Sequence, residues 1–342
     1  MGLGWETDSP GESLSMASTE TGRPVAALRG LLVRHESVLL VILVASLLVL
    51  ALQSDRFLTP DNLLNQGRLM AEVALVALPM TFIIITGGID LSVGSIMGLC
   101  AIILGYSWKN FGLPLELAIL VTLAVGSAAG FVNGWFITRI KVPPLIMTLA
   151  TLALYRGLAE GISQARSVRG YPEWFFIVGQ GDVLGVPTQL WILAVAIIAC
   201  WIALSRTTFG RALYAIGHNE VAARFSGIPV DRYKLAIYTF SGFMAGLAGF
   251  IFVSRVSTTR SDMGTGLELD VIAAVVLGGT SIFGGIGTIA GTVIGFILIQ
   301  LLKNGLALTG VKGDATIVVI GTVLILSILI TNFVQSRRGG EG

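Results

Sequence analysis

Ten apolar stretches separated by short polar segments make up most of this 342-residue chain. Hydrophobic residues account for 54% of it and charged residues for only 12%, which is about half the charged share of a soluble domain. Such a chain buries its apolar surface in a lipid bilayer. We therefore expect an all-α, polytopic membrane protein with about ten transmembrane segments. The stretches cover residues 37–54, 69–86, 91–108, 115–137, 143–162, 190–205, 235–256, 267–283, 286–303 and 315–333.

Some of these stretches are too short or too rich in glycine to be plain membrane-crossing helices. A crossing needs about 20 residues, and the stretches at 91–108, 267–283 and 286–303 combine many glycines with close spacing. Irregular backbone inside a membrane is tolerated only where protein buries it. These three segments are therefore expected to be broken or re-entrant.

The chain divides into three regions. Residues 1–36 have little apolar surface to bury, so we expect a disordered extension there. Residues 37–334 form the transmembrane domain, and 335–342 form a short tail. Ten crossings put both termini on one side, and basic clusters near membrane spans stay cytoplasmic. Both the extension and the tail are therefore expected in the cytoplasm.

The polar segment 206–234 holds the densest basic cluster in the chain, which favours a cytoplasmic position. Asn219 is a good helix cap, Glu220 suits the first helical turn, and Gly227 suits the end of a helix. A helix over about 220–226 is too short to be stable alone in water. It must lie against a surface, which is either the lipid headgroups or a soluble cytoplasmic partner.

Glycines recur at every fourth position in two apolar stretches. This spacing gives a helix a smooth face on which a neighbouring backbone packs closely. Gly217, just before the short helix, is expected to take a positive φ angle, which other residues rarely adopt. Close helix packing is expected at Gly126, Gly130, Gly134, Gly287, Gly291 and Gly295.

The stretch TGGIDLSVGSIMG (86–98) breaks the apolar pattern with two adjacent glycines, an aspartate and two serines. Asp90 is placed to cap a helix that begins at Leu91. Alternatively, Asp90 and Ser92 lie beside a translocation path or gate. A charge facing lipid would cost about 2.5–3.5 kcal/mol, which disfavours lipid exposure. Asn133, in the first glycine-patterned stretch, either bonds across a helix contact or binds substrate.

The longest segment expected on the exterior side runs from 163 to 189 and carries several aromatic residues. Aromatic side chains are enriched where a protein meets the membrane–water interface. The alternative is a surface that receives a partner outside the cytoplasm. The aromatic residues include Tyr171, Trp174, Phe175 and Phe176.

Acidic residues near the ends of two apolar stretches stand four positions after an arginine. This spacing puts both side chains on one helical face, where they form ion pairs. The expected pairs are Arg68 with Glu72 and Arg156 with Glu160.

Several chemistries have no residues to support them. The chain has neither the GxxxxGK[ST] phosphate-binding loop nor the GxSxG nucleophile elbow. Its two histidines, His35 and His218, lie outside the apolar stretches, so no metal cluster is expected. A net charge of +2 does not indicate a nucleic-acid partner. We expect a protein that is not an enzyme and has no cofactor.

Three sequence motifs, which occur in the family's order along the chain, carry a resemblance to a known family. TGGIDLSVGSIMG, GRALYAIGHNEVAARFSGI (210–228) and LDVIAAVVLGGTSIFGGIGTIAGTVIG (269–295) are joined by FLTPDNLL (57–64). Together they resemble the simple-sugar permeases of bacterial ATP-binding-cassette importers, the ribose/xylose/arabinose group. The resemblance covers about residues 35–335. Within the group, residues 76–102 and TRSDMG (259–264) are most similar to permeases for rhamnose or autoinducer-two.

This resemblance implies a multi-pass permease of the bacterial inner membrane that imports a monosaccharide or a similar small polyol-like solute. It implies a cytoplasmic ATP-binding-cassette ATPase, an extracytoplasmic sugar-binding protein and a second permease subunit, identical or related, besides membrane lipid. It also implies that the loop 206–234 contacts the ATPase. The residues of that contact would be Gly217, His218, Asn219, Glu220, Ala222, Ala223, Arg224, Gly227 and Ile228.

Two other functional classes are open to a chain of this kind. An ion-coupled secondary transporter usually carries ionisable residues within the membrane, and charges in the middle of the apolar stretches are nearly absent here. An intramembrane enzyme needs a nucleophile beside a base, and the sequence offers no such pair. Substrate-stimulated ATP hydrolysis by a separate subunit would distinguish an importer from both.

The clustered arginines predict the topology. We expect residues 217 and 337 to be cytoplasmic and residue 171 to be exterior. Single cysteines at these positions, in a Cys100→Ala, Cys200→Ala background, would be labelled with a membrane-impermeant reagent. Labelling of a cysteine at 171 only after the cytoplasmic face is opened would reverse the orientation.

Overall fold

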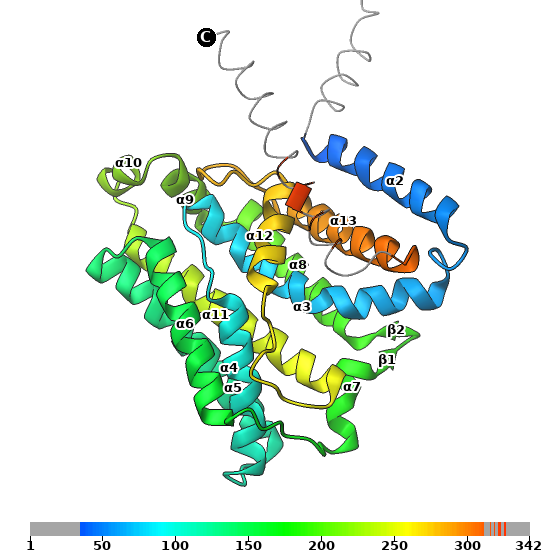
Figure 1. The fold of residues 1–342 in the computed structure, drawn as a ribbon. Helices are drawn as coiled ribbons and strands as arrows, with labels where there is room; N and C mark the ends of the chain where they lie inside the picture. Colours follow the sequence, from blue (N-terminus) through cyan, green and yellow to red (C-terminus); the bar gives the residue numbers. More distant parts are fainter. Residues whose placement is uncertain (1–34, 311–314, 316–317, 319–320, 323–324, 326–342) are drawn as a thin grey trace, which may run out of the picture.

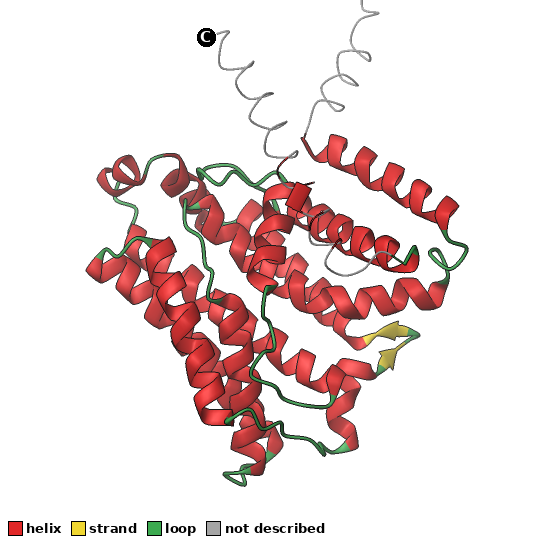
Figure 2. Cartoon of the chain, in the orientation of Figure 1, coloured by secondary structure: helices red, strands yellow, loops and turns green. Residues whose placement is uncertain are grey.

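The computed structural model of the protein describes residues 35–310 together with residues 315, 318, 321, 322 and 325. This part of the chain is almost entirely helical, with one small antiparallel hairpin (Figure 2). The predicted disorder of the N-terminal extension falls on residues 1–34, outside the described part. Most of the tenth apolar stretch and the whole of the tail fall outside it as well.

Figure 1 labels the elements in chain order. The helices are α2 (His35–Gln53), α3 (Pro60–Ile85), α4 (Val93–Lys109), α5 (Leu115–Trp135), η2 (Phe136–Ile140), α6 (Pro144–Ser163), η3 (Glu173–Phe175), α7 (Phe176–Gln180), α8 (Thr188–Arg206), α9 (Thr208–His218), α10 (Glu220–Phe225), α11 (Val230–Val256), α12 (Leu267–Leu277) and α13 (Ile289–Leu308). The hairpin strands are β1 (Asp182–Val183) and β2 (Val186–Pro187).

Within the described residues, six helices are long and apolar enough to cross a membrane: α3, α5 with η2, α6, α8, α11 and α13. Two shorter apolar segments are Leu39–Leu52 in α2 and the helix α4. The all-α membrane class is therefore supported, whereas the expected count of about ten crossings is not confirmed.

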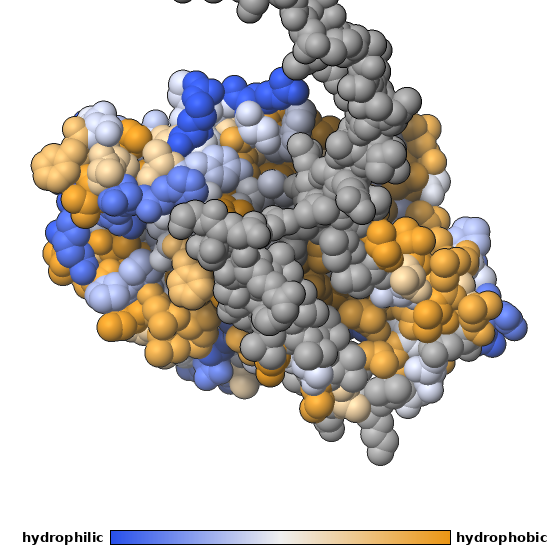
Figure 3. Space-filling model, turned by 90° about the horizontal axis from the view of Figure 1, so that it is seen from above, coloured by the Kyte–Doolittle hydropathy of each residue, from blue (hydrophilic) through white to orange (hydrophobic). Residues whose placement is uncertain are grey.

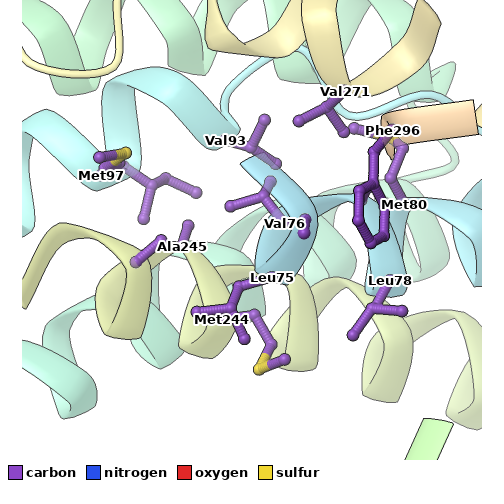
Figure 4. Packing of buried hydrophobic residues seen from close by; sticks show 14 of the residues in the cluster. Leu75, Val76, Leu78, Met80, Val93, Met97, Met244, Ala245, Val271 and Phe296 are labelled. Carbon is purple, nitrogen blue, oxygen red and sulfur yellow. The ribbon is translucent and has the colours of Figure 1, made fainter. Parts of the chain in front are cut away.

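Helix α3 lies at the centre of the fold. Pro60 occupies its first turn, where a missing N–H costs nothing, and the Thr59 hydroxyl accepts from the N–H of Asn62. In its most apolar part 78% of the residues are buried, and it contacts α8, α9, α11, α12 and α13. Figure 4 shows α3 side chains such as Met80 packed beside Phe296 of α13.

Helices α5 and α11 pack with their backbones in direct contact. A Cβ atom at Gly126 would lie 2.5 Å from the Gly242 carbonyl oxygen, and one at Gly130 would overlap the Tyr238 carbonyl oxygen. A Cβ at Gly134 would lie 3.1 Å from the Cα atom of Leu235. These glycines therefore occupy the close face between the two helices.

The second glycine series lies against α12, with one difference from the sequence pattern. A Cβ at Gly291 would overlap the Gly278 carbonyl, and one at Gly295 would overlap the Ala274 carbonyl. Gly287 is not helical, because α13 begins only at Ile289. It packs instead against the side chain of Thr280.

The connection between α11 and α12 explains why the eighth apolar stretch yields a short helix. It runs back along α4, where Thr259 lies beside Gly105, Met263 beside Gly98 and Gly264 beside Gly94 (Figure 1). Helix α12 consequently begins next to the start of α4 and has 11 residues. The expectation of a broken ninth stretch was wrong, since α13 is a continuous helix of 20 residues.

Arg156 of α6 holds this connection in place. The ion pair that the sequence predicted between Arg156 and Glu160 is absent from the described contacts. The Arg156 guanidinium donates to the carbonyl oxygens of Ser261 and Met263 in the connection and of Gly94 in α4. One side chain thus satisfies three backbone acceptors on two segments.

The expected pair of Arg68 with Glu72 was also wrong. Arg68 bonds instead to Asp182 of β1, with 2.6 Å between the nitrogen and oxygen atoms. Glu72 bonds to Arg255 at the end of α11, at 2.7 Å. Both pairs join separate elements, because the partners across the tertiary fold lie closer than those on the same helix.

Two of the aromatic residues in the 163–189 segment belong to the protein core. Tyr171 and Phe175 are 6% and 0% exposed, and their rings stack with centroids 4.6 Å apart. Trp108 stacks on the other side of Tyr171 at the same separation. The membrane-interface interpretation was therefore wrong for these two rings, whereas Trp174 remains 41% exposed.

The α5–α11 contact predicts that Gly130→Leu destabilises the fold. The leucine would push apart two touching backbones, at a cost of about 1–3 kcal/mol. Gly157→Leu is the matched control, because Gly157 lies on α6 with open space at its Cβ position. We expect lower membrane yield and earlier thermal aggregation in detergent for Gly130→Leu alone. Equal behaviour of the two variants would contradict the contact.

Candidate functional site

The short helix predicted from the sequence is present as α10. The chain leaves α8, turns at Thr207 into α9, and turns again at Asn219 into α10 (Figure 1). The Asn219 side-chain oxygen accepts from the N–H of Ala222 at 2.9 Å. Asn219 therefore caps the helix as its residue type predicts, and Glu220 occupies the first turn.

The C-terminal end of α10 closes with a Schellman motif. Gly227 has a φ angle of +83°, which glycine adopts readily. The N–H of Ile228 donates to the Ala223 carbonyl at 3.1 Å, and the N–H of Gly227 donates to the Arg224 carbonyl at 3.0 Å. Ala223 is buried in a small apolar cluster with Ile228 and Val230. Both ends of α10 are thus held by local hydrogen bonds.

Of four linked ion pairs at α10, one lies within the helix, two join it to α11, and one joins α11 to Lys141. Glu220 pairs with Arg224 at 2.8 Å and with Lys234 at 2.5 Å. Arg224 also pairs with Asp231 at 2.5 Å, and Asp231 pairs with Lys141 at 2.8 Å. Partial burial alone would raise the pKa of Glu220, but hydrogen bonds from Lys234 and Arg224 outweigh it and lower that pKa. Helix α10 is therefore fastened to the first turn of α11.

The outer face of α10 is apolar and has nothing packed on it among the described residues. Val221 is 62% exposed and Phe225 is 89% exposed, and Ala222 between them is exposed as well. Val221 and Phe225 are four positions apart, so they lie on one helical face. A capped and ion-paired helix that presents apolar side chains outward is suited to contact another surface.

Gly217 is required for a different reason from the one expected. It lies within α9 and has no positive φ angle, so that expectation was wrong. A Cβ atom there would overlap the Ile85 carbonyl oxygen and the Gly285 nitrogen. The neighbouring His218 ring lies against Gly285. Gly217 therefore lets α9 touch the end of α3.

Asp90, Ser92 and Asn133 are brought together in one buried cluster, each of them 0% exposed. One carboxylate oxygen of Asp90 accepts from the Ser92 hydroxyl at 2.6 Å and from the Ser92 N–H at 3.0 Å. The other oxygen accepts from the Ser241 hydroxyl of α11 at 3.1 Å. The Asn133 amide of α5 donates to the Ser92 hydroxyl at 2.8 Å. The cluster links α5 and α11 to the start of α4.

The capping geometry at Asp90 differs in detail from the prediction. Helix α4 begins at Val93, with Ser92 as its N-cap residue, instead of at Leu91. Asp90 holds the N–H of Ser92 and so stabilises the turn that leads into the helix. Among the described residues no basic side chain forms an ion pair with Asp90. The carboxyl oxygens of Asp90 are satisfied by the hydrogen bonds from Ser92 and Ser241, and the group lies near the N-terminus of α4.

Three important partners were missed at the sequence level: Ser241, Asp231 and Lys141. Ser241 stands in an apolar stretch, where a single serine gives a weak signal. Lys141 and Asp231 are 90 positions apart, and no local pattern joins them. For a metal, the described residues offer no group of three or more potential His, Cys, Asp or Glu ligands.

The hydrogen bonds predict the behaviour of two Asp90 variants. Asp90→Asn keeps an oxygen for Ser92 and an amide that can donate to Ser241, so assembly and most activity should persist. Asp90→Leu leaves buried donors unsatisfied at about 1–3 kcal/mol each. We expect that variant to be poorly folded, as measured by yield and size-exclusion profile. An assembled but inactive Asp90→Asn protein would show that the charge itself is needed.

Comparison with known proteins identifies a family and several relatives. A family model described as branched-chain amino acid transport system / permease component matches residues 62–328. The ribose import permease protein of Escherichia coli (strain K12) is 38% identical over 321 residues, which are 92% of this chain and 98% of that protein. The ribose import permease protein of Bacillus subtilis (strain 168) is 41% identical over 285 residues, 83% of this chain and 88% of that protein.

A third relative is named for a different solute. The autoinducer 2 import system permease protein of Escherichia coli O9:H4 (strain HS) is 36% identical over 300 residues, 86% of this chain and 91% of that protein. No solved structure matches the chain. Because the family model covers most of the chain and the relatives are aligned over nearly their full lengths, the protein belongs to the family of transport-system permease components.

Proposed function

We propose that this permease imports a monosaccharide or a similar small polyol-like solute, driven by a separate cytoplasmic ATP-binding-cassette ATPase. The relatives named for ribose and autoinducer 2 support this cargo class. Family membership makes the chain a membrane subunit for transport, not itself an enzyme. Energy for uphill import must therefore enter through contact with another protein.

The observation that carries the proposal is the construction of α10. The helix has six residues, yet it is capped at both ends and ion-paired to α11. Such a short helix does not hold its shape in water without those constraints. It presents Val221 and Phe225 outward instead of burying them. A firmly attached apolar projection is suited to fit a pocket of the ATPase and to transmit its movement to α11.

The assembly we propose contains a second permease subunit, identical or related, two copies of the ATPase and an extracytoplasmic sugar-binding protein. The α10 end then faces the cytoplasm, as do both termini, and the α7 and hairpin end faces outward. Tyr171 is buried, so Leu184 in the hairpin, which is 89% exposed, is the better position for exterior labelling.

Two variants test α10 as the coupling element. Gly217→Val should displace α9, because its Cβ would overlap the Ile85 carbonyl. Glu220→Lys should break both ion pairs of Glu220 and place a cation at the positive end of the helix. Both variants should insert normally, because neither changes a membrane-crossing helix. Both should reduce solute uptake at least tenfold.

The matched controls lie away from α10. Gly161→Val is on α6 with open space at its Cβ position, and Glu116→Lys is an exposed acid in the first turn of α5. ATPase pull-down and substrate-stimulated hydrolysis in proteoliposomes would be measured together for all four variants. If the two α10 variants bind the ATPase, stimulate it and transport as the controls do, α10 is not the coupling element.

A further inference from the structure

We propose that the turn at 281–286, between α12 and α13, is a second docking point for the same ATPase, beside α10. This inference rests on the proposed function. The turn presents Phe283, which is 86% exposed, close to the exposure of Phe225 on α10. Its neighbours Ile282 and Ile286 are 38% and 52% exposed, and a contiguous exposed apolar patch marks a contact site.

The backbone of the turn is built to project Phe283. The N–H of Ser281 donates to the Ile286 carbonyl at 2.9 Å, and the N–H of Gly284 donates to the Ser281 carbonyl at 3.0 Å. Gly284 and Gly285 have φ angles of +90° and +77°, which side-chain-bearing residues rarely adopt. The chain therefore reverses tightly directly after Phe283. Such a turn holds its tip in one position.

The turn is fixed to the same end of the molecule as α10. The N–H of Gly285 donates to the Ile85 carbonyl of α3 at 2.8 Å. The Tyr214 hydroxyl of α9 donates to the Gly287 carbonyl at 2.6 Å, and the His218 ring lies against Gly285. Because α9 leads directly into α10, one element positions both projections. Figure 1 shows α9, α10 and this turn together at one end of the fold.

The charge around the two phenylalanines indicates the kind of partner. Arg139, Arg211 and Arg232 at this end are exposed, and within the described contacts none of them has an ion-pair partner. Figure 3 looks onto this end and shows hydrophilic residues beside hydrophobic ones on the face that the grey atoms leave visible. A partner that complements this end is a soluble protein whose surface has two apolar pockets with acidic residues around them.

Contacts of the ATPase with both α10 and the 281–286 turn would give it two routes to the Asp90 cluster. The turn bonds to Ile85, five residues before Asp90 in the chain. Helix α10 is ion-paired to α11, which carries the Ser241 that bonds Asp90. Movement of the ATPase at either projection would reach the cluster through packed backbone. We therefore expect the loss of either contact to weaken coupling.

The direct test is photocrosslinking in the full complex. The photoreactive residue p-benzoylphenylalanine would replace Phe283, Phe225 or Phe111 in separate variants. Phe111, 77% exposed between α4 and α5, is the control. We expect adducts with the ATPase from positions 283 and 225 and none from position 111. Adducts from 225 but only lipid or permease adducts from 283 would overturn this inference and leave the proposed function intact.

If neither 225 nor 283 reaches the ATPase, the proposed coupling function itself fails. A binding measurement adds a second readout. Phe283→Ala should weaken ATPase binding to the solubilised permease about tenfold, whereas Phe283→Trp should bind within about twofold of the parent, because it retains a large apolar ring. Unchanged affinity in the correctly folded Phe283→Ala protein would also overturn the second docking point.

Discussion

The direct contact between the backbones of α5 and α11 sets the position of the buried polar cluster. Gly126 and Gly130 allow α11 to approach so closely that the short side chains of Asn133 and Ser241 reach the turn before α4. A wider helix separation would leave Asp90 without its hydrogen bond from Ser241. In a hydrocarbon environment such a loss is costly, because no water replaces the missing partners.

Close backbone contact, made possible by glycines, also occurs at the α10 end of the molecule. There Gly217 and Gly285 let α9 and the 281–286 turn meet the last carbonyl of α3. The His218 ring and the Tyr214 hydroxyl add side-chain contacts between α9 and the turn. The end of α3, the α9–α10 corner and the turn before α13 therefore form one connected body. Displacement of one of these segments would therefore strain the other two.

Features set by local chemistry were predictable from the sequence. Asn219 and Gly227 give the limits of α10 because caps act over a few residues. The partners of Glu72 and Arg156 were not predictable, because tertiary contacts replaced those on the same helix. The short length of α12 depends on a connection that lies along α4, and apolar content says nothing about such a path. Asp90 was recognisable as unusual, whereas its bond to Ser241 required the fold.

The contacts of Arg156 carry a consequence for the segment that it holds. The guanidinium is the shared donor for carbonyls in the α11–α12 connection and at the start of α4. If that side chain withdraws, all of these acceptors lose their donor together, each at an energetic cost. The attachment of α6 to the connection and to the start of α4 therefore depends on one side chain, and its loss would weaken both attachments at once.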